Sequence, residues 1–394
     1  MPKDSVLIVC GGLLQLPAVE AAHRLGLRAI VTDANPDAPT MRIADEAHVV
    51  DIYDIPNHVA LGLKLRDRLA GVFTEGADVE VTVASTAAAL GLPGVSVEAA
   101  KNCKNKWRMR QRLNAIGISP VRMGREAESS FPFVVKPSDN CGSRGIHIVN
   151  NATELNIAID DAMKNSTNKL VLFEEYLTGP QQSVEILFDA QGKCHWLNIV
   201  DRIFDGVMEM GHVNPSRLPD EHRAALYQMT EQAAAAVGVN FGAFKGDTIW
   251  TDNGPRILEV TARLSGGFDC QRTTPLATGR DFIGAAMAVS CGLPIPEDAL
   301  TPKCQRWAAA WAAFPKPGKV TRLPDYVVES GGGPWWGSDG MTRIFRVKIG
   351  DIIEPYEHCA QRPGFVIAIG DSYEAAIDNA KRGAAVLAES IVTE

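Results

Sequence analysis

The sequence predicts an α/β protein that begins with a doubly wound parallel sheet, and two observations support this fold class. Short apolar strands alternate with helices through the first segment, as at Ser5 to Cys10, Pro17 to Leu25 and Arg28 to Thr32. A Gly11-Gly12 turn joins the first strand to the first helix, which is typical of strand–helix–strand units. At 394 residues the chain is long for one core, so two or three domains are expected.

The alternation continues with a strand at Ala47 to Val50, a helix from about Pro56 to Leu69 and a strand at Gly71 to Thr74. Parallel strands present their carboxyl ends at one edge of the sheet, where open sheets bind small ligands. We therefore expect Gly11-Gly12 and Thr74-Glu75-Gly76 to line a crevice at that edge.

A dinucleotide-binding fingerprint is the weaker interpretation of the same segment. Asp33 ends the second strand, as the ribose-binding acid of that motif does. However, Leu13, Leu14 and Gln15 stand where GxGxxG requires its second and third glycines. We do not expect this segment to bind NAD.

Composition and charge exclude several classes of protein. The formal net charge of −8 argues against a nucleic-acid partner held by a broad basic surface. Eight cysteines show no CxxC pair or zinc spacing, so they are expected to be reduced thiols. The N-terminal region lacks the long apolar stretch of a signal peptide, and no run of about 18 apolar residues occurs. We expect no membrane partner and a cytoplasmic protein.

The segment from Gly242 to Arg263 carries the clearest sign of metal chemistry. Two apolar, β-branched runs flank the turn residues 252–255 and should pair as a hairpin. If the turn centres near Asn253, Asp247 and Glu259 lie opposite each other, close enough to share a divalent cation. Mg²⁺ is commonly held by one or two carboxylates together with nucleotide phosphates. The alternative is a solvated hairpin with two exposed acids.

A glycine- and serine-rich loop lies between two strands further towards the N-terminus. Lys136 is on the first strand, residues 138–145 read SDNCGSRG, and a second strand runs from Ile146 to Val149. Exposed backbone N–H groups in such a loop can surround phosphate oxygens, and Lys136 adds a cation beside them. A plain hairpin with a glycine loop is the alternative.

A basic helix precedes this loop and an aromatic strand follows it. From about Ala99 to Gly117 we expect one helix crowded with lysines and arginines, a pattern that usually marks a solvated face. After a helix at Thr153 to Met163, the strand with Phe173, Tyr176 and Leu177 offers free edge groups suited to a flat purine. Core packing of these apolar residues is compatible with that interpretation.

The order of these parts resembles the ATP-grasp enzymes over nearly the whole chain, most closely the carboxylate–amine ligases of the L-amino acid or dipeptide type. The resemblance implies an ATP-grasp fold that is α+β in its nucleotide-binding part. It also implies that ATP is bound with Mg²⁺, or Mn²⁺ in its place. The residues that match the family's ATP-binding positions are Lys106, Lys136, Ser138, Gly142, Ser143, Gly145, Glu174, Glu175, Tyr176, Leu177 and Gln181.

The resemblance assigns the metal to Asp247, Glu259 and Thr261, but the chain departs from the family at two positions. Thr261 stands where the family commonly has Asn, which puts the number of metal ions in doubt. Gln181 stands where the family commonly has a Glu for the ribose hydroxyls, with Glu185 further on. Which residue holds ribose therefore stays open.

The same resemblance assigns catalytic roles to Arg263, Gly266, Gly267 and His212. Arg263 would steady the transferring phosphoryl group, and the glycine amides would hold the acyl phosphate or the substrate carboxylate. His212, with Arg202, would face a substrate pocket, and the histidine would act as a base. A lone histidine is more often structural, and that alternative stands beside the catalytic one.

The implied domain plan has four parts. Residues 1–98 form the doubly wound domain, 99–178 a small subdomain with the phosphate-binding loop, and 179–300 a large subdomain with the metal site. Residues 301–394 form an α/β appendage that completes the large domain. In the appendage we expect strands at Arg343 to Ile349 and Gly364 to Ile369, and an Ala-rich helix from a Ser372 cap to Ile391.

The implied activity joins a carboxylate to an amine through an acyl phosphate, with release of ADP and phosphate. Its substrates would be small and amino-acid-like, and a two-fold homodimer is the usual expectation for such a protein. Two alternatives remain. One is a bicarbonate-activating or purine-pathway enzyme on the same scaffold, and the other is an ATP-binding sensor or subunit without catalysis, which the changes at Gln181 and Thr261 would favour.

Overall fold

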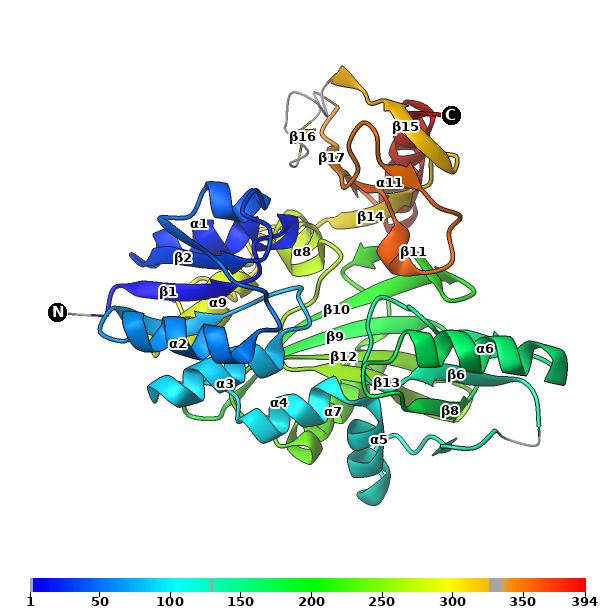
Figure 1. The fold of residues 1–394 in the computed structure, drawn as a ribbon, viewed down its shortest axis with the longest axis horizontal. Coiled ribbons are helices and arrows are strands. Elements are labelled where there is room, and N and C mark those ends of the chain that lie inside the picture. The colour runs from blue at the N-terminus through cyan, green and yellow to red at the C-terminus, as the bar shows by residue number, and fades with distance from the viewer. Residues whose placement is uncertain (1–2, 128–129, 326–334, 337–338) are drawn as a thin grey trace.

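The computed structural model describes residues 3–127, 130–325, 335–336 and 339–394. Figure 1 shows the N-terminal domain at one end of a long central sheet, the small subdomain with α6 at the other, and the C-terminal part above the sheet. Among the helices of these residues, none combines the length and apolar character that a bilayer crossing requires.

The first domain is a four-stranded parallel sheet in the order β3-β2-β1-β4, which confirms the predicted doubly wound start. Its strands are β1 Ser5–Val9, β2 Arg28–Asp33, β3 Glu46–Val49 and β4 Leu69–Phe73. The segments around it are η1 Leu13–Gln15, α1 Leu16–Arg24, η2 Pro39–Arg42, α2 Ile55–Leu65 and α3 Glu80–Leu90. The prediction for α2 was too long, because Leu69 is fully buried as the first residue of β4.

The Gly-Gly turn of this domain is closed by Asp33. Its carboxylate accepts hydrogen bonds from the Gly11 amide at 2.8 Å and the Asn35 amide at 2.9 Å. Asp33 is thus used to fasten the turn.

A nine-stranded sheet joins the middle of the chain to its C-terminal part, in the order β13-β12-β9-β10-β11-β14-β19-β17-β16. In chain order its strands are β9 Gln181–Phe188, β10 Cys194–Asp205, β11 Met208–Asn214, β12 Gly242–Thr251, β13 Gly254–Thr261, β14 Trp307–Ala313, β16 Trp335–Trp336, β17 Thr342–Phe345 and β19 Gly364–Gly370. The pairing of β11 with β14 joins the strands from the middle of the chain to those of its C-terminal part.

Helices cover this sheet where its strands are apolar. Helix α7, Asp220–Val237, shares a core with β9, β12 and β13, and α11, Tyr373–Glu389, packs on β14 and β19. The small residues of β14, WAAAWAA, leave room for α11 to approach closely. Ser372 caps α11 as predicted, because its side chain accepts a hydrogen bond from the Ala375 amide. Helix α9, Phe282–Ser290, packs against α1 and β4 and so ties the first domain to the sheet.

Two smaller sheets complete the fold. The small subdomain holds β5 Met123–Gly124, β6 Phe133–Pro137, β7 His147–Val149 and β8 Val171–Glu175 in the order β5-β8-β6-β7. Helix α6, Ala152–Lys164, shares the core of that sheet. The C-terminal part adds β15 Gly318–Arg322, β18 Ile352–Ile353 and β20 Val392–Thr393. Short segments η3 Asp269–Thr273, α8 Thr274–Thr278 and η4 Cys359–Gln361 connect the rest.

The predicted single basic helix is two helices, α4 Val97–Lys104 and α5 Lys106–Ala115. Asn105 has an extended backbone and caps α5, because its side chain accepts a hydrogen bond from the Arg108 amide. Asparagine stabilises a helix N-terminus in this way, which favours a break at this residue. The break makes Lys106 the first residue of α5.

Gly179 sits where the chain passes from β8 to β9, at a point that leaves no space for a side chain. Its φ is +144°, and an added Cβ would lie 1.9 Å from the Trp250 carbonyl oxygen on β12. Gly206 also has a positive φ, but a Cβ there would meet nothing within 4 Å. A side chain at Gly206 would therefore meet backbone strain alone, whereas a side chain at Gly179 would meet strain and atomic overlap.

Gly179→Ala should lower the free energy of unfolding by about 1–3 kcal/mol more than Gly206→Ala does, because overpacking adds to the strain of a positive φ. Urea unfolding followed by circular dichroism measures the difference. If both variants lose the same free energy of unfolding, the β8–β9 connection can shift to accommodate a side chain at residue 179 without a further loss of stability.

Candidate active site

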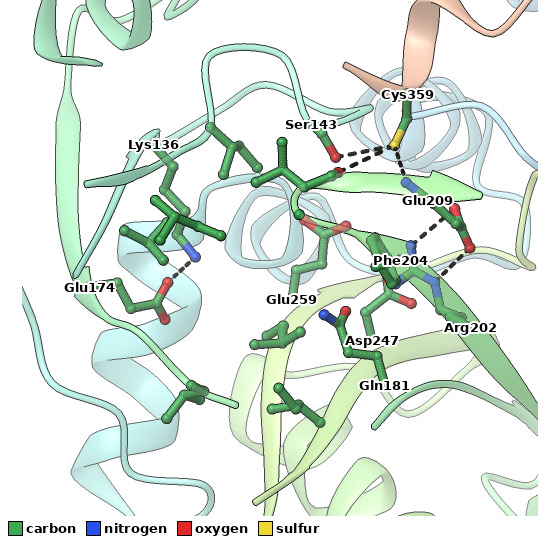
Figure 2. Close-up of a pocket in the computed structure, with 18 of the residues that line it drawn as sticks. Lys136, Ser143, Glu174, Gln181, Arg202, Phe204, Glu209, Asp247, Glu259 and Cys359 are labelled. Atoms are coloured by element: carbon green, nitrogen blue, oxygen red, sulfur yellow. Dashed lines mark hydrogen bonds and ion pairs between the residues drawn. The ribbon is translucent and has the colours of Figure 1, made fainter. Parts of the chain in front are cut away.

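A cavity of about 460 Å³ lies between the small four-stranded sheet and the β9-β12-β13 end of the large sheet. Strands β6 and β8 supply one wall, and β9, β10, β12 and β13 supply the other. The loop between β6 and β7, residues 138–146, closes the top, and we call it the flap. Figure 2 shows Asp247, Glu259 and Gln181 directed into one space, with Lys136 and Glu174 on one side of it and Arg202 and Glu209 on the other.

Most of the residues predicted to bind ATP or metal line this cavity. They are Lys106, Lys136, Gly142, Ser143, Glu174, Glu175, Tyr176, Leu177, Gln181, Asp247 and Glu259. Ser138 does not line it, because its hydroxyl is buried against the Asn168 side chain at 3.0 Å. Gly145 does not line it either, since its Cα faces Ala162 and Asn165 of the α6 end. Both residues shape the base of the flap.

The predicted register of the β12–β13 hairpin is confirmed. The loop is two residues long, and a β-bulge between Asp247 and Thr248 shifts the register so that Asp247 pairs with Glu259. Cations surround both acids: Lys106 Nζ lies 3.2 Å from Glu259 Oε2, and Asp247 is held by Arg202 Nη1 at 2.9 Å and Lys245 Nζ at 2.8 Å. The hairpin thus presents two carboxylates on one face, already neutralised by three cations.

These contacts keep Glu259 ionised. Burial alone would raise its pKa, but the positive charges of Lys106 and Lys245 outweigh burial and lower the pKa to about 2. Burial likewise opposes the charge of Lys106, and the Glu259 carboxylate reverses this, so the pKa of Lys106 is raised. The pair therefore carries its full charges near neutral pH.

Glu174 on β8 is a second centre of charge, held by cations from two other elements. Lys136 of β6 forms an ion pair with it, and Arg110 of α5 approaches at 3.2 Å. Arg110 is only 1 % exposed and also donates to the carbonyls of Ser119 and Ile257. Burial lowers the pKa of Lys136. Strand β8 is thereby locked to α5 next to the predicted purine-binding edge.

The flap contacts the C-terminal part of the chain. The Ser143 hydroxyl lies 3.4 Å from the Cys359 thiol, and the Glu209 amide of β11 donates to that sulfur at 3.2 Å. Lys106 Nζ donates to the Asn140 carbonyl of the flap at 2.7 Å. The cavity is therefore closed on the flap side by residues far apart in the sequence (Figure 2).

A second cavity, of about 940 Å³, adjoins the first. Its walls come from the first domain, the flap, the Gly267 turn and the C-terminal part, and they include the predicted crevice residues Gly12 and Gly76. Thr74 and Glu75, which were expected there, lie beneath the wall, since both are buried and neither lines the space. Five residues line both cavities and mark their junction: Cys141, Gly142, Arg144, Cys359 and Arg362.

The predicted catalytic residues lie apart from the first cavity. Gly267 lines the second cavity, and Gly266 packs behind it against Gly76. Arg263 is buried, donates to the Leu264 carbonyl and forms an ion pair with Asp78, which itself lines the second cavity. A role for Arg263 in phosphoryl transfer would require that pair to open.

The turn that carries Gly266 and Gly267 rests on a buried acid network. Ser265 donates from its amide and hydroxyl to Glu185, and its hydroxyl lies 2.9 Å from Asp269. Burial raises the pKa of both carboxyls. Glu185 is fully buried in this network and does not line the first cavity, whereas Gln181 does.

His212 has a structural placement. It lies on β11, is 6 % exposed, and its ring nitrogen is 3.0 Å from the Thr273 hydroxyl. Burial lowers its pKa to about 4, and it lines neither cavity. This placement fits the structural alternative for His212, and its role as a base stays a prediction.

Sequence reasoning missed several residues of the first cavity. Arg110 was placed on a solvated face, and Glu209, Cys359 and Arg362 were not singled out. Glu209 binds Arg202 at 2.9 Å, and Arg362 donates to the Glu209 carbonyl at 2.9 Å. Strand pairing over more than a hundred residues brings these side chains together, and no local motif signals it.

The donor set fits a hard divalent cation. Within the part of the chain that the structure describes, no three His, Cys, Asp or Glu side chains form a metal cluster, so a cation would rely on Asp247, Glu259 and ligand oxygens. Mg²⁺ is characteristically held by one or two carboxylates plus phosphates. Thr261 lies on the Glu259 face of β13, and its buried hydroxyl lacks a hydrogen-bond partner among the described residues. That free oxygen is consistent with a further, indirect contact to the ion.

Comparison with known proteins places this geometry in a family. Residues 129–271 match the ATP-grasp domain model. The chain is 28 % identical to the uncharacterized protein y4rH of Sinorhizobium fredii over 303 residues, and 25 % identical to carnosine synthase 1 of Gallus gallus over 337 residues. These matches cover 70 % and 74 % of this chain but only 60 % and 35 % of the two relatives, so the chain spans less than two thirds of the length of either relative.

The fold is also shared along the whole chain. The structure of an L-amino acid ligase from Bacillus licheniformis superposes with a TM-score of 0.80 at 21 % identity and covers 99 % of both chains. Most of the residues that line the cavity between the two sheets belong to the segment that the family model matches. The chain therefore contains an ATP-grasp domain and has the ATP-grasp fold, with a doubly wound parallel sheet before that domain.

Proposed function

We propose that this protein is an ATP- and Mg²⁺-dependent ligase that joins a carboxylate to an amine and releases ADP and phosphate. One observation carries the proposal: a cavity with two lysines and two opposed carboxylates meets a second, larger cavity at a glycine flap. A phosphoryl donor in the first space can then reach an acceptor in the second while the flap excludes water.

The first cavity supplies the groups that ATP requires. The β8 edge from Glu174 to Leu177 receives adenine, and Gln181 faces ribose. Lys106, Lys136 and the flap amides contact the phosphates, where cations stabilise the charge that spreads over the transferring group. Mg²⁺, or Mn²⁺, held by Asp247 and Glu259, would neutralise part of the phosphate charge. Arg202 and Lys245 keep the Asp247 carboxylate in place.

The second cavity receives the acid and the amine. A carboxylate oxygen of the acid attacks the γ-phosphorus and ADP leaves, which gives an acyl phosphate. The amine then attacks the acyl carbon, the C–O bond to phosphate breaks, and the amine loses a proton to solvent or to the departing phosphate. The Gly267 turn, which lines this cavity, is assigned to hold the acyl group.

Two similar proteins support amino-acid-like substrates over the alternatives. An L-amino acid ligase shares the whole fold, and carnosine synthase 1 is a relative in sequence. A bicarbonate-activating or purine-pathway enzyme on this scaffold is the second candidate, and a sensor without turnover is the third. Eight free cysteines are consistent with a cytoplasmic enzyme, and a homodimer remains our expectation for its assembly.

The first prediction concerns turnover. ADP release should require ATP, Mg²⁺, an acid and an amine together, and Glu259→Gln should lower it by roughly 100-fold or more, because transition-state charge loses its stabiliser. A coupled ADP assay across pairs of amino acids and small carboxylates measures it. Asp252→Asn, an exposed change at the turn of the same hairpin, is the control. Bicarbonate-dependent turnover would favour the second candidate, and tight ATP binding without turnover on any pair would favour the sensor.

The second prediction concerns the phosphate-binding lysines. Lys136→Met should weaken binding of a non-hydrolysable ATP analogue by roughly ten- to a hundredfold, the value of a hydrogen bond to a charged group. Isothermal titration calorimetry measures the dissociation constant, and Lys164→Met on the exposed end of α6 serves as the matched control. Unchanged affinity in Lys136→Met would remove Lys136 from the ATP site.

The third prediction concerns the unpartnered hydroxyl near the metal carboxylates. Thr261→Val should raise the Mg²⁺ concentration for half-maximal ADP release about tenfold, as losses of indirect metal contacts do. Thr261→Ser keeps the hydroxyl and should stay near the wild-type requirement. If Thr261→Val behaves like the wild type, the metal depends on the two carboxylates alone.

A further inference from the structure

The second cavity is cationic, although the chain as a whole carries a net charge of −8. Arg144, Arg346, Lys348 and Arg362 line it, against two carboxylates, Asp78 and Asp351. Asp78 is already paired with Arg263. One oxygen of Asp351 accepts the Lys348 backbone amide at 2.9 Å. Arg362 is paired with the Glu209 carboxylate at 3.6 Å, so Arg144, Arg346 and Lys348 remain against Asp351, and these side-chain cations outnumber the acids available to neutralise them.

Arg346 has no carboxylate partner among the residues that the structure describes. Its backbone amide donates to the Pro363 carbonyl at 2.8 Å, which fixes the start of its side chain at the end of β17. Desolvation by surrounding protein atoms, and after it the positive charge of Arg362, lower the pKa of its guanidinium. Two neighbouring cations that face one cavity repel each other, and an anion between them would relieve that repulsion.

The four cations occupy two different parts of the cavity. Arg144 and Arg362 also line the first cavity and so stand at the junction, where a transferring phosphoryl group would meet its acceptor. Arg362 is held rigidly there, since its Nε donates to the Cys359 carbonyl at 2.8 Å and its guanidinium stacks on Phe365 at 4.8 Å. Arg346 and Lys348 line the second cavity and not the first. Arg346 is close enough to Arg362 for their charges to interact.

Part of the wall of the second cavity is apolar. Leu13, Leu14, Phe268, Phe345 and Phe365 line the cavity, and Phe268 packs edge-to-face on Phe365. Such a wall suits the carbon chain of a ligand whose two ends are charged.

We propose, resting on the function proposed above, that the acid substrate carries a second anionic group, which Arg346 and Lys348 bind while its reacting carboxylate lies at the junction beside Arg362. Arg346 is then a specificity-determining residue. The second group is a carboxylate or a phosphate, because a guanidinium fork binds either one in the same two-pronged way.

The test uses pairs of acids that differ only at the far end. Binding to the full chain is measured by calorimetry with Mg²⁺ and a saturating non-hydrolysable ATP analogue, for L-aspartate against L-asparagine, L-glutamate against L-glutamine, and O-phospho-L-serine against L-serine. At least one anionic member should bind tenfold or more tightly than its neutral partner. The pair that shows the larger ratio identifies carboxylate or phosphate as the second group.

Variants assign the discrimination to its residues. Arg346→Met should bring the anionic and neutral members of that pair to within about twofold, Arg346→Lys should keep part of the preference, and Lys348→Met should reduce it independently. Arg322→Met, an exposed arginine on β15 outside the cavity, should keep the wild-type ratio, and melting curves verify that each variant is folded.

Equal binding within all pairs, no binding of any anionic member, or an unchanged ratio in Arg346→Met would overturn the proposal. Because the readout is binding, it is separate from turnover. Anionic acids that bind as expected but support no ADP release would contradict the ligase and leave this assignment standing. ADP release with neutral acids only would support the ligase and contradict the assignment of an anion-binding site to Arg346 and Lys348.

Discussion

Charge pairing at the β12–β13 hairpin is the constraint on which the rest of the site depends. Asp247 and Glu259 lie opposite each other because a β-bulge next to Asp247 adds one residue to the register that the two-residue loop sets. Both carboxylates are enclosed and paired with cations. Lys106 comes from α5 and Arg202 from β10, so satisfying two acids requires the small subdomain and the large sheet to meet here. Removing one partner of such a pair leaves an uncompensated charge.

The same pairing explains how the site can accept its ligands. A polyphosphate offers Lys106 and Lys136 a replacement for Glu259 and Glu174, and a divalent cation offers Asp247 and Glu259 a replacement for the lysine and arginine. Each group exchanges one partner of opposite charge for another, so binding leaves few charges unpaired. Contact between the flap and Cys359 extends this arrangement to the C-terminal part, which also supplies three of the four cations of the second cavity.

Local chemistry allowed much of this to be predicted from sequence. Turn residues identified the β12–β13 hairpin, in which a β-bulge completes the Asp247–Glu259 pairing, and strand–helix alternation identified the first parallel sheet. Other features depend on distant pairing. Arg110 was expected to be solvated because it belongs to a run of charged residues, whereas it is buried against Glu174 of a distant strand. Arg362 and Cys359 reach the site only because β14 and β19 join the sheet, and His212 is excluded from it by packing that no short motif reveals.

The most direct test of the central claim follows oxygen from the acid to phosphate. An acid substrate labelled with ¹⁸O in both carboxylate oxygens is incubated with ATP, Mg²⁺ and the amine, and the inorganic phosphate is analysed by mass spectrometry. If the carboxylate attacks the γ-phosphorus, each phosphate released carries one ¹⁸O atom and the amide keeps the other. Unlabelled phosphate, or AMP in place of ADP, would contradict the account.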